Sequence, residues 1–287
     1  MSNILEVKNL SKHMGEGGVI DISFSVPYGS IVGLIGENGA GKRTIINTIL
    51  GLMHKEEGKI NIFGIANEKL NKKMMEKIGV VFDSNSFPVS FTPTKINNVL
   101  KKTYDSWDEN IFYTYLKRFS IPENKKIKNF SQGMKVKLNL ATALSHNVNL
   151  LILDEATNGL DPIVRNEILD IFLEFVQEET HSILVASHLI ADFDKIADYI
   201  TFIHEGKIVF NENKDSLKSE YCIVKCGVSN IEEIDKKDII KFIKKDYEYQ
   251  FLSKDKTAME SKYKDFVVEN VDVEEIMLFY IKGNDIE

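Results

Sequence analysis

Residues 31–44 read IVGLIGENGAGKRT, and the architecture of the whole chain can be built outward from them. The segment opens with a short apolar run, typical of a strand buried on both faces. Gly36, Gly41 and Lys42 then fit the spacing G-x-x-x-x-G-K, in which backbone N–H groups surround phosphate oxygens. Residues 42–53 favour a helix, and a helix N-terminus attracts anions. The sequence therefore predicts a phosphate-binding loop between a buried strand and a helix.

The lysine of this loop indicates which anion binds. Lys42 places a positive charge where the β- and γ-phosphates of a nucleotide would lie. A glycine-rich turn without a ligand is the simpler interpretation, but a lysine at the start of the helix, with correct flanks, disfavours it. The predicted nucleotide contacts in the loop are Gly36, Asn38, Gly39, Gly41, Lys42, Arg43 and Thr44.

Arg43 departs from the motif, because Ser or Thr normally follows the lysine and its hydroxyl holds Mg²⁺. A guanidinium has no acceptor atom and keeps its charge. Thr44 lies one residue later, about 100° further around a helix, and should not point at the usual metal position. Two interpretations stay open. Either Arg43 binds phosphate oxygens and partly replaces the charge of the metal, or it points away and the metal keeps its remaining ligands and water.

A second chemical signal lies in residues 149–156, which read NLLILDEA. Four apolar residues precede Asp154 and Glu155, so a buried strand should deliver both carboxylates to the C-terminal edge of a parallel sheet, where ligands bind. Asp154 is then expected to hold Mg²⁺, directly or through water, and Glu155 to polarise the attacking water. Alone, such a pair more often ends a strand and caps a helix. Downstream of a phosphate loop, it favours nucleotide chemistry.

The order of the expected elements predicts an α/β protein with two additions. Residues 3–12 alternate and favour an edge strand, and residues 18–27 favour a second strand. Residues of about 88–145 have helical spacing and predict an inserted helical subdomain. Beyond them, strands and helices alternate again until the composition shifts toward Lys, Asp, Glu and Ile. We therefore expect a main domain of residues 1–212 and a C-terminal accessory α+β domain of residues 213–287.

The accessory region has its own pattern of short elements. Residues 221–228, 249–254 and 265–270 favour strands, because they are rich in β-branched and aromatic side chains. Residues 231–246 and 273–283 favour helices. In the second of these, apolar side chains recur at helical spacing, which predicts burial against a core or a partner.

Bulk composition narrows the function classes. With 43% hydrophobic and 28% charged residues, the chain resembles an ordinary globular protein, and its net charge of −7 argues against a nucleic-acid binder that relies on a basic surface. No run approaches the roughly 18 apolar residues of a membrane span, and the N-terminus lacks the pattern of a signal peptide. Cys222 and Cys226 are the only cysteines, so a reducing cytosol fits and a disulfide framework does not.

Five motifs together resemble the nucleotide-binding subunit of an ATP-binding cassette (ABC) transporter, over residues 1 to about 212. GENGAGKRT is similar to Walker A and LLILDE to Walker B. FSQGMK resembles the ABC signature, NGLD the D-loop, and Ser187-His188 the switch histidine. Their order makes the match more specific than any one motif. The resemblance implies a P-loop NTPase (RecA-like) core with an antiparallel β edge, an inserted helical subdomain and a small C-terminal α+β appendage.

The resemblance also implies a mechanism. Two such subunits, from the same chain or a sibling, sandwich two ATP molecules, and Ser131 and Gly133 contact the γ-phosphate held by the opposite chain. His188 senses the γ-phosphate and acts with Glu155 in catalysis, and Asp154 holds Mg²⁺. In isolation, Ser131 would be a plain helix cap and His188 an ordinary strand-end histidine. The implied partners are an integral membrane permease and a second nucleotide-binding subunit, with no nucleic acid. The implied location is cytoplasmic, at the inner face of the membrane.

Departures from the family pattern affect adenine and metal binding. Met14 or His13 falls where an aromatic usually stacks on adenine, so adenine should be held less firmly. Asp83 or a near neighbour in DSNS, residues 83–86, replaces the usual Gln, and its carboxylate still suits a cation. Only Arg43 removes a recognised metal ligand.

The helical region and the last helix resemble a bacterial exporter subgroup with separate ATPase and membrane chains, which includes the phenol-soluble modulin exporters. The favoured interpretation is an ATPase that powers an exporter, with Mg²⁺-dependent hydrolysis weakened by Arg43. One alternative is a degenerate ATP-binding subunit paired with a competent sibling. The other is a soluble ABC protein acting on ribosomes or DNA, for which tandem cassettes, a long coiled coil or a basic face would be typical.

Overall fold

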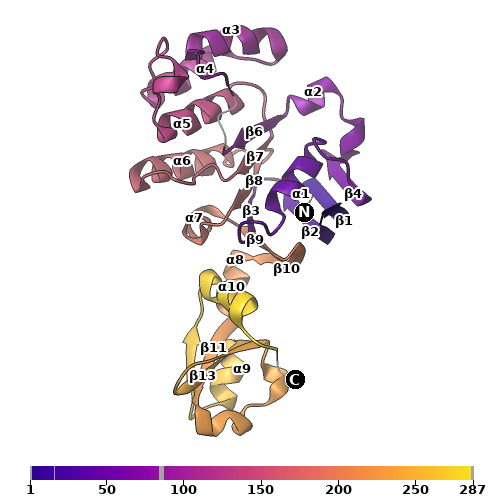
Figure 1. Cartoon of the computed structure of the whole chain (residues 1–287), viewed down its shortest axis with the longest axis vertical. Coiled ribbons are helices and arrows are strands. Elements are labelled where there is room, and N and C mark those ends of the chain that lie inside the picture. The colour runs from indigo at the N-terminus through magenta and orange to yellow at the C-terminus, as the bar shows by residue number, and fades with distance from the viewer. Residues whose placement is uncertain (1, 16, 84–86, 286–287) are drawn as a thin grey trace.

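The computed structural model describes residues 2–15, 17–83 and 87–285. Asp83 is therefore described, whereas the remaining residues of DSNS, 84–86, lie outside the described residues. In Figure 1 the elements up to β10 form a larger upper body, and the elements from α8 onward form a smaller body below it.

The larger body is built around a six-stranded sheet of order β10-β9-β3-β8-β7-β6. All neighbouring strands are parallel except β10, which runs antiparallel to β9. Every residue of β3, β7 and β8 is buried, as expected for parallel strands covered on both faces. The strands are β3 Ile31–Ile35, β6 Ile78–Phe82, β7 Leu150–Asp154, β8 Ser182–Ser187, β9 Tyr199–His204 and β10 Lys207–Asn213.

A second, antiparallel sheet packs on one face of the first. Its order is β2-β1-β4-β5, with β1 Asn3–Met14, β2 Gly17–Pro27, β4 Glu57–Ile62 and β5 Ile65–Ala66. The prediction of an edge strand at residues 3–12 is therefore wrong, because β1 pairs with both β2 and β4. The alternating pattern reports one buried face of the strand, and it carries no information on whether both strand edges are paired.

Helices cover the opposite face of the central sheet (Figure 1). The helical subdomain contains α3, α4 and α5, whose N-caps Thr92, Asp108 and Ser131 each accept a backbone N–H with the side chain. The helices of the larger body are α1 Lys42–Ile49, α2 Lys72–Met75, α3 Pro93–Thr103, α4 Glu109–Arg118, α5 Gln132–Ala143, α6 Pro162–Phe175 and α7 Ile190–Ile196, with 3-10 turns at Asn67–Lys69 and Ile127–Asn129.

The smaller body holds a four-stranded antiparallel sheet of order β12-β13-β11-β14. Its strands are β11 Tyr221–Gly227, β12 Lys241–Lys244, β13 Glu248–Lys254 and β14 Val267–Asn270, and its helices are α8 Lys214–Glu220, α9 Lys256–Lys262 and α10 Val273–Lys282. The helix predicted at residues 231–246 is wrong. That stretch forms 3-10 turns at Val228–Glu233 and Lys236–Asp238 and then β12, because Phe242 and Ile243 pair with β13 in the sheet.

Helix α10 joins the two bodies, since it packs against both α7 and α8. The ring of Tyr280 lies 6.4 Å from that of Phe202 and 5.9 Å from that of Phe210, between ring centroids. Ile276 and Phe279 are buried in the same apolar cluster as the helices of the larger body. The apolar spacing noted in residues 273–283 therefore serves a shared core.

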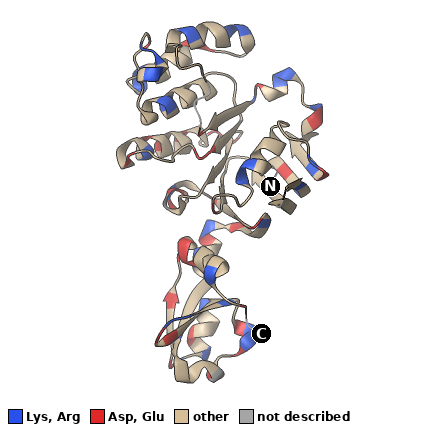
Figure 2. Ribbon diagram, in the orientation of Figure 1, with Lys and Arg blue, Asp and Glu red and all other residues tan. Residues whose placement is uncertain are grey.

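Charges of both signs are spread over the chain, but not evenly. Figure 2 shows that Lys and Arg outnumber Asp and Glu along α3, α4 and the loop before α5. The helical subdomain is thus locally basic within a chain whose net charge is −7.

Candidate active site

A cavity of about 380 Å³ lies where the phosphate loop meets the C-terminal ends of β6 and β7. The strands of a parallel sheet all end at one edge, which brings segments distant in sequence together there. The lining residues are Glu37, Asn38, Gly39, Gly41, Lys42, Arg43, Thr44, Asp83, Asp154, Glu155 and Asn158. The structure thus joins the predicted phosphate loop and the predicted acidic pair in one site.

Glycines are needed at two places in the loop. A Cβ on Gly36 would lie 2.3 Å from the carbonyl oxygen of Ile203, and one on Gly41 would lie 2.5 Å from the Val19 side chain. Gly41 also has a φ of +110° and is the N-cap of α1, with no side chain to cap the helix. The first-turn N–H groups of α1 therefore have no capping side chain and are available to an anion.

Lys42 is 6% exposed and folds back onto its own loop. Its Nζ donates to the carbonyl oxygens of Gly36, at 2.6 Å, and Glu37, at 3.1 Å. It also lies 3.3 Å from Oε1 of Glu155. The lysine is thus held at the cavity by partners that a phosphate group can replace.

Glu155 is held by its backbone and by a histidine. Its φ of +54° lies in the left-handed region, which is uncommon for a residue with a side chain. The backbone N–H donates to the carbonyl of Ala186 at 2.9 Å, which fixes this conformation. His188, just after β8, places Nδ1 2.8 Å from Oε2 of Glu155. The two residues predicted to be catalytic are therefore in direct contact.

Arg43 does not point away from the site. Its Nε donates to Oδ2 of Asp154 at 2.9 Å, and the arginine side chain is 61% exposed whereas that of Asp154 is 4% exposed. Burial raises the pKa of Asp154, and the guanidinium acts in the opposite direction by favouring the charged carboxylate. An arginine from the phosphate loop therefore pairs with the carboxylate that was expected to hold metal.

The donor set does not fit a resident Mg²⁺ ion. Arg43 replaces the hydroxyl ligand and engages an oxygen of Asp154. Asp83 does line the same cavity, since the parallel register places Phe82 opposite Asp154. Within the described ranges, however, no three His, Cys, Asp or Glu side chains gather as a metal site. Magnesium needs oxygen ligands in nearly octahedral geometry. Here the guanidinium of Arg43 replaces one such ligand and adds a positive charge.

The remaining predicted contacts lie away from the cavity lining. Met14 ends β1 and is 48% exposed, and the neighbouring His13 is engaged by Glu56, with Nδ1 2.5 Å from Oε2. Ser131 caps α5 by accepting the backbone N–H of Met134 at 3.2 Å. Gly133 follows on the same helix. Met14, Ser131 and Gly133 therefore do not line the cavity of their own chain.

The sequence reasoning missed two lining residues. Glu37 lies inside the phosphate loop, where its backbone carbonyl was not considered as a partner for Lys42. Asn158 begins the NGLD stretch, which was assigned only to the D-loop motif. The glycine-rich spacing and the acidic pair gave no signal for either side chain.

Comparison with known proteins places this site in a family. The model of the family described as "ABC transporter" matches residues 19–158. The bacitracin transport ATP-binding protein BcrA of Bacillus licheniformis is 34% identical over 221 residues, covering 76% of this chain and 72% of that protein. The lantibiotic transport ATP-binding protein SrtF of Streptococcus pyogenes is 32% identical over 235 residues, covering 80% and 95%. The chain belongs to the ATP-binding proteins of ABC transporters.

Solved structures agree on the fold. A structure of an ATP-binding subunit of an ABC transporter is 26% identical, with a TM-score of 0.68 over 75% of this chain and 92% of the other. A dimeric ATP-binding cassette in a post-hydrolysis state, bound to ADP and Pi, is 23% identical with a TM-score of 0.65, over 73% and 98%. The predicted fold class is confirmed, and the protein is an ATPase of the ABC class.

Helices long and apolar enough to cross a bilayer are absent from the part of the chain that the structure describes.

Proposed function

We propose that this chain is the ATP-hydrolysing subunit of a bacterial exporter, located at the cytoplasmic face of the membrane. The observation that carries the proposal is the cavity lined by both Lys42 and Glu155, in which Glu155 also contacts His188. The two relatives named above act in bacitracin and lantibiotic transport, which supports export as the task. The finer likeness to phenol-soluble modulin exporters stays a prediction.

Nucleotide binding is expected to release the catalytic base. In the structure Glu155 is held by Lys42 and by His188, both of which also suit the γ-phosphate of ATP. When the phosphate takes these two partners, the Glu155 carboxylate is freed to accept a proton from the attacking water. The left-handed backbone at Glu155 keeps the carboxylate at the edge of the sheet throughout.

The geometry of the same site indicates that ATP hydrolysis is slow. Phosphoryl transfer requires stabilisation of the negative charge that develops on the transferred group. Arg43 replaces a hydroxyl ligand and engages Asp154, so the site is poorly arranged for the usual Mg²⁺-assisted chemistry. Asp154, Glu155 and His188 are all present, which favours a slow enzyme over a degenerate subunit that depends on a sibling.

The positions of Ser131 and Gly133 support a mechanism in which two nucleotide-binding subunits act together. Ser131 and Gly133 lie at the N-terminus of α5, outside the cavity of their own chain. We propose that they contact the ATP held by a second nucleotide-binding subunit, either the same chain or a sibling. A helix N-terminus suits a phosphate, and the Ser131 hydroxyl adds a donor.

An apolar groove lined in part by Phe82, the residue before Asp83, suits the membrane partner. It has a volume of about 530 Å³, and Leu52 and Met75 on its walls are 68% and 54% exposed. The groove lies between the end of α1, β6 and the end of α3. Its lining residues are Ile49, Leu50, Leu52, Asn67, Leu70, Lys72, Met75, Glu76, Ile78, Val80, Phe82, Thr103 and Tyr104.

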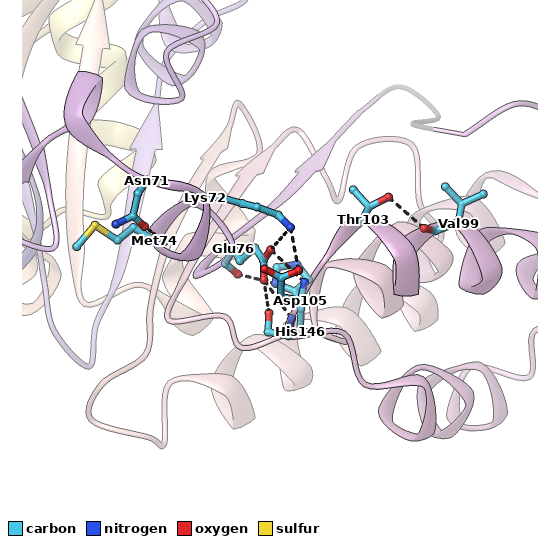
Figure 3. A network of polar contacts seen from close by, with 9 residues as sticks. Asn71, Lys72, Met74, Glu76, Val99, Thr103, Asp105 and His146 are labelled. Carbon is cyan, nitrogen blue, oxygen red and sulfur yellow. Dashed lines mark hydrogen bonds and ion pairs between the residues drawn. The ribbon is translucent and has the colours of Figure 1, made fainter.

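A polar network around the buried side chain of Glu76 fixes one end of this groove (Figure 3). Glu76 accepts the backbone N–H groups of Asp105 and Ser106, each at 3.1 Å, and the carbonyl of Glu76 lies 2.7 Å from Nδ1 of His146. Lys72 reaches Asp105 at 2.9 Å. These contacts tie the segment that carries α2 to the helical subdomain, so a partner seated in the groove would contact both parts.

Cysteines placed in the groove are expected to cross-link to an integral membrane chain. The variants Leu52→Cys and Met75→Cys, treated with a bifunctional thiol reagent in membranes from cells that make the transporter, provide the measurement. The native thiols should not react with the reagent, because Cys222 and Cys226 are buried and burial raises the pKa of Cys222 to about 11. Val267→Cys, on the exposed strand β14, is the matched control. Products that contain only soluble proteins would refute the transporter assignment.

Residues 213–287 are proposed to be an accessory domain of this subunit. Its helix α10 contacts α7, and α7 follows His188 directly in the chain. The accessory domain therefore borders the helix that follows a proposed catalytic residue, although it supplies no lining residue to the cavity.

A further inference from the structure

Arg43 occupies a bridging position in the cavity. It is the second residue of α1, and its Nε bonds to Asp154 at the end of β7. The two Nη groups make no hydrogen bond with any residue that the structure describes, and the side chain is 61% exposed. One edge of the guanidinium is thus bound to protein, while its remaining donors are open to a ligand in the cavity.

The charges that line the cavity explain why a cation at the position of Arg43 matters for nucleotide binding. Glu37, Asp83, Asp154 and Glu155 line it, with Lys42 and Arg43 as the lining cations. A triphosphate brought against these carboxylates is repelled unless a cation lies between them. In the ordinary site a divalent metal does this, by binding the acidic strand on one side and phosphate oxygens on the other.

A guanidinium can perform both parts of this task. It is planar, permanently charged, and matches phosphate oxygens with a fork of parallel N–H donors. With Nε on Asp154, the free Nη groups are the donors for the triphosphate. A divalent ion at the same place would meet a fixed positive charge that no accessible pH removes.

We infer that Arg43 is a tethered cation that takes the place of the metal, so that this chain binds metal-free ATP as well as it binds MgATP. The inference rests on the proposed function, because it concerns the same nucleotide site. It deepens that function by naming the form of nucleotide that the site recognises.

Calorimetric titration of the full chain with ATP, once with excess MgCl₂ and once with excess EDTA, tests the inference. For the chain itself, the two dissociation constants should agree within about threefold. Arg43→Ser restores a hydroxyl and removes the guanidinium, so its affinity should fall by at least about tenfold when the metal is chelated. Arg43→Ala restores no ligand and should bind more weakly than the parent chain in both conditions.

Arg118→Ser is the matched control, since Arg118 forms an exposed ion pair with Glu174 on another part of the molecule. It should reproduce the parent values. A parent chain that loses tenfold or more in affinity on chelation, as Arg43→Ser should, would overturn the inference and leave the ATP site in place. Absence of ATP binding under both conditions would instead refute the nucleotide site, and the inference with it.

Discussion

Glu155→Gln is expected to slow ATP hydrolysis by at least about two orders of magnitude, the usual scale for loss of a positioned base. The amide keeps the shape of the side chain and its hydrogen bond distance to His188, but it cannot accept the proton of the attacking water. ATP binding should be unchanged. Steady-state turnover and ATP affinity, measured on the same preparation, separate the two effects.

Glu178→Gln provides the control for this variant, because Glu178 is exposed and lies outside the cavity lining. It should keep turnover close to that of the parent chain. Glu155→Gln should also accumulate as a nucleotide-bound dimer in size-exclusion chromatography, since each ATP would stay between Lys42 of one chain and Ser131 of the other. Hydrolysis at the parental rate in Glu155→Gln would move the chemistry to another residue.

Lys42→Ala is expected to weaken ATP binding by about two orders of magnitude, the scale for truncating one partner of a buried charged contact. The lysine is 6% exposed and lies at the start of α1, where no other side chain of the loop can place a charge so deeply. The variant also removes the contacts of Nζ to Gly36 and Glu37. Calorimetry measures the affinity, and thermal unfolding verifies that the variant is folded.

Lys8→Ala is a suitable control, since the Lys8 side chain is 62% exposed on β1 and pairs only with Glu6 in the described structure. Its ATP affinity should match that of the parent. If Lys42→Ala were folded and bound ATP as tightly as Lys8→Ala, the residues 36–44 would not be the phosphate-binding loop.

Much of the fold was predictable because its signals are local and strongly patterned. The apolar runs that became β3 and β7 indicated buried strands, and the stretch that starts at Lys42 was expected to form the helix that follows the glycine-rich loop. Edge or interior position in a sheet depends on partners far away in sequence. For that reason β1 was misassigned, although its alternation was recognised.

Other features depend on tertiary contacts that no spacing reveals. Residues 231–246 contain several helix-favouring Lys and Glu residues, yet pairing with β13 draws part of the stretch into a strand. The identity of Arg43 showed that a metal ligand was missing, but its bond to Asp154 requires β7 and α1 to be brought together by the sheet. The left-handed backbone of Glu155 is likewise fixed by the neighbouring strand β8.

We propose that Arg43 restrains an ABC ATPase site in which Asp154, Glu155 and His188 are all present. The test is steady-state ATP hydrolysis across a MgCl₂ titration, for the parent chain and for Arg43→Ser. The parent should turn over ATP slowly, with little dependence on MgCl₂. Arg43→Ser should turn over faster, with clear MgCl₂ dependence, because the variant regains a hydroxyl and loses the competing cation. Equal turnover and an equal MgCl₂ midpoint for the two proteins would contradict it.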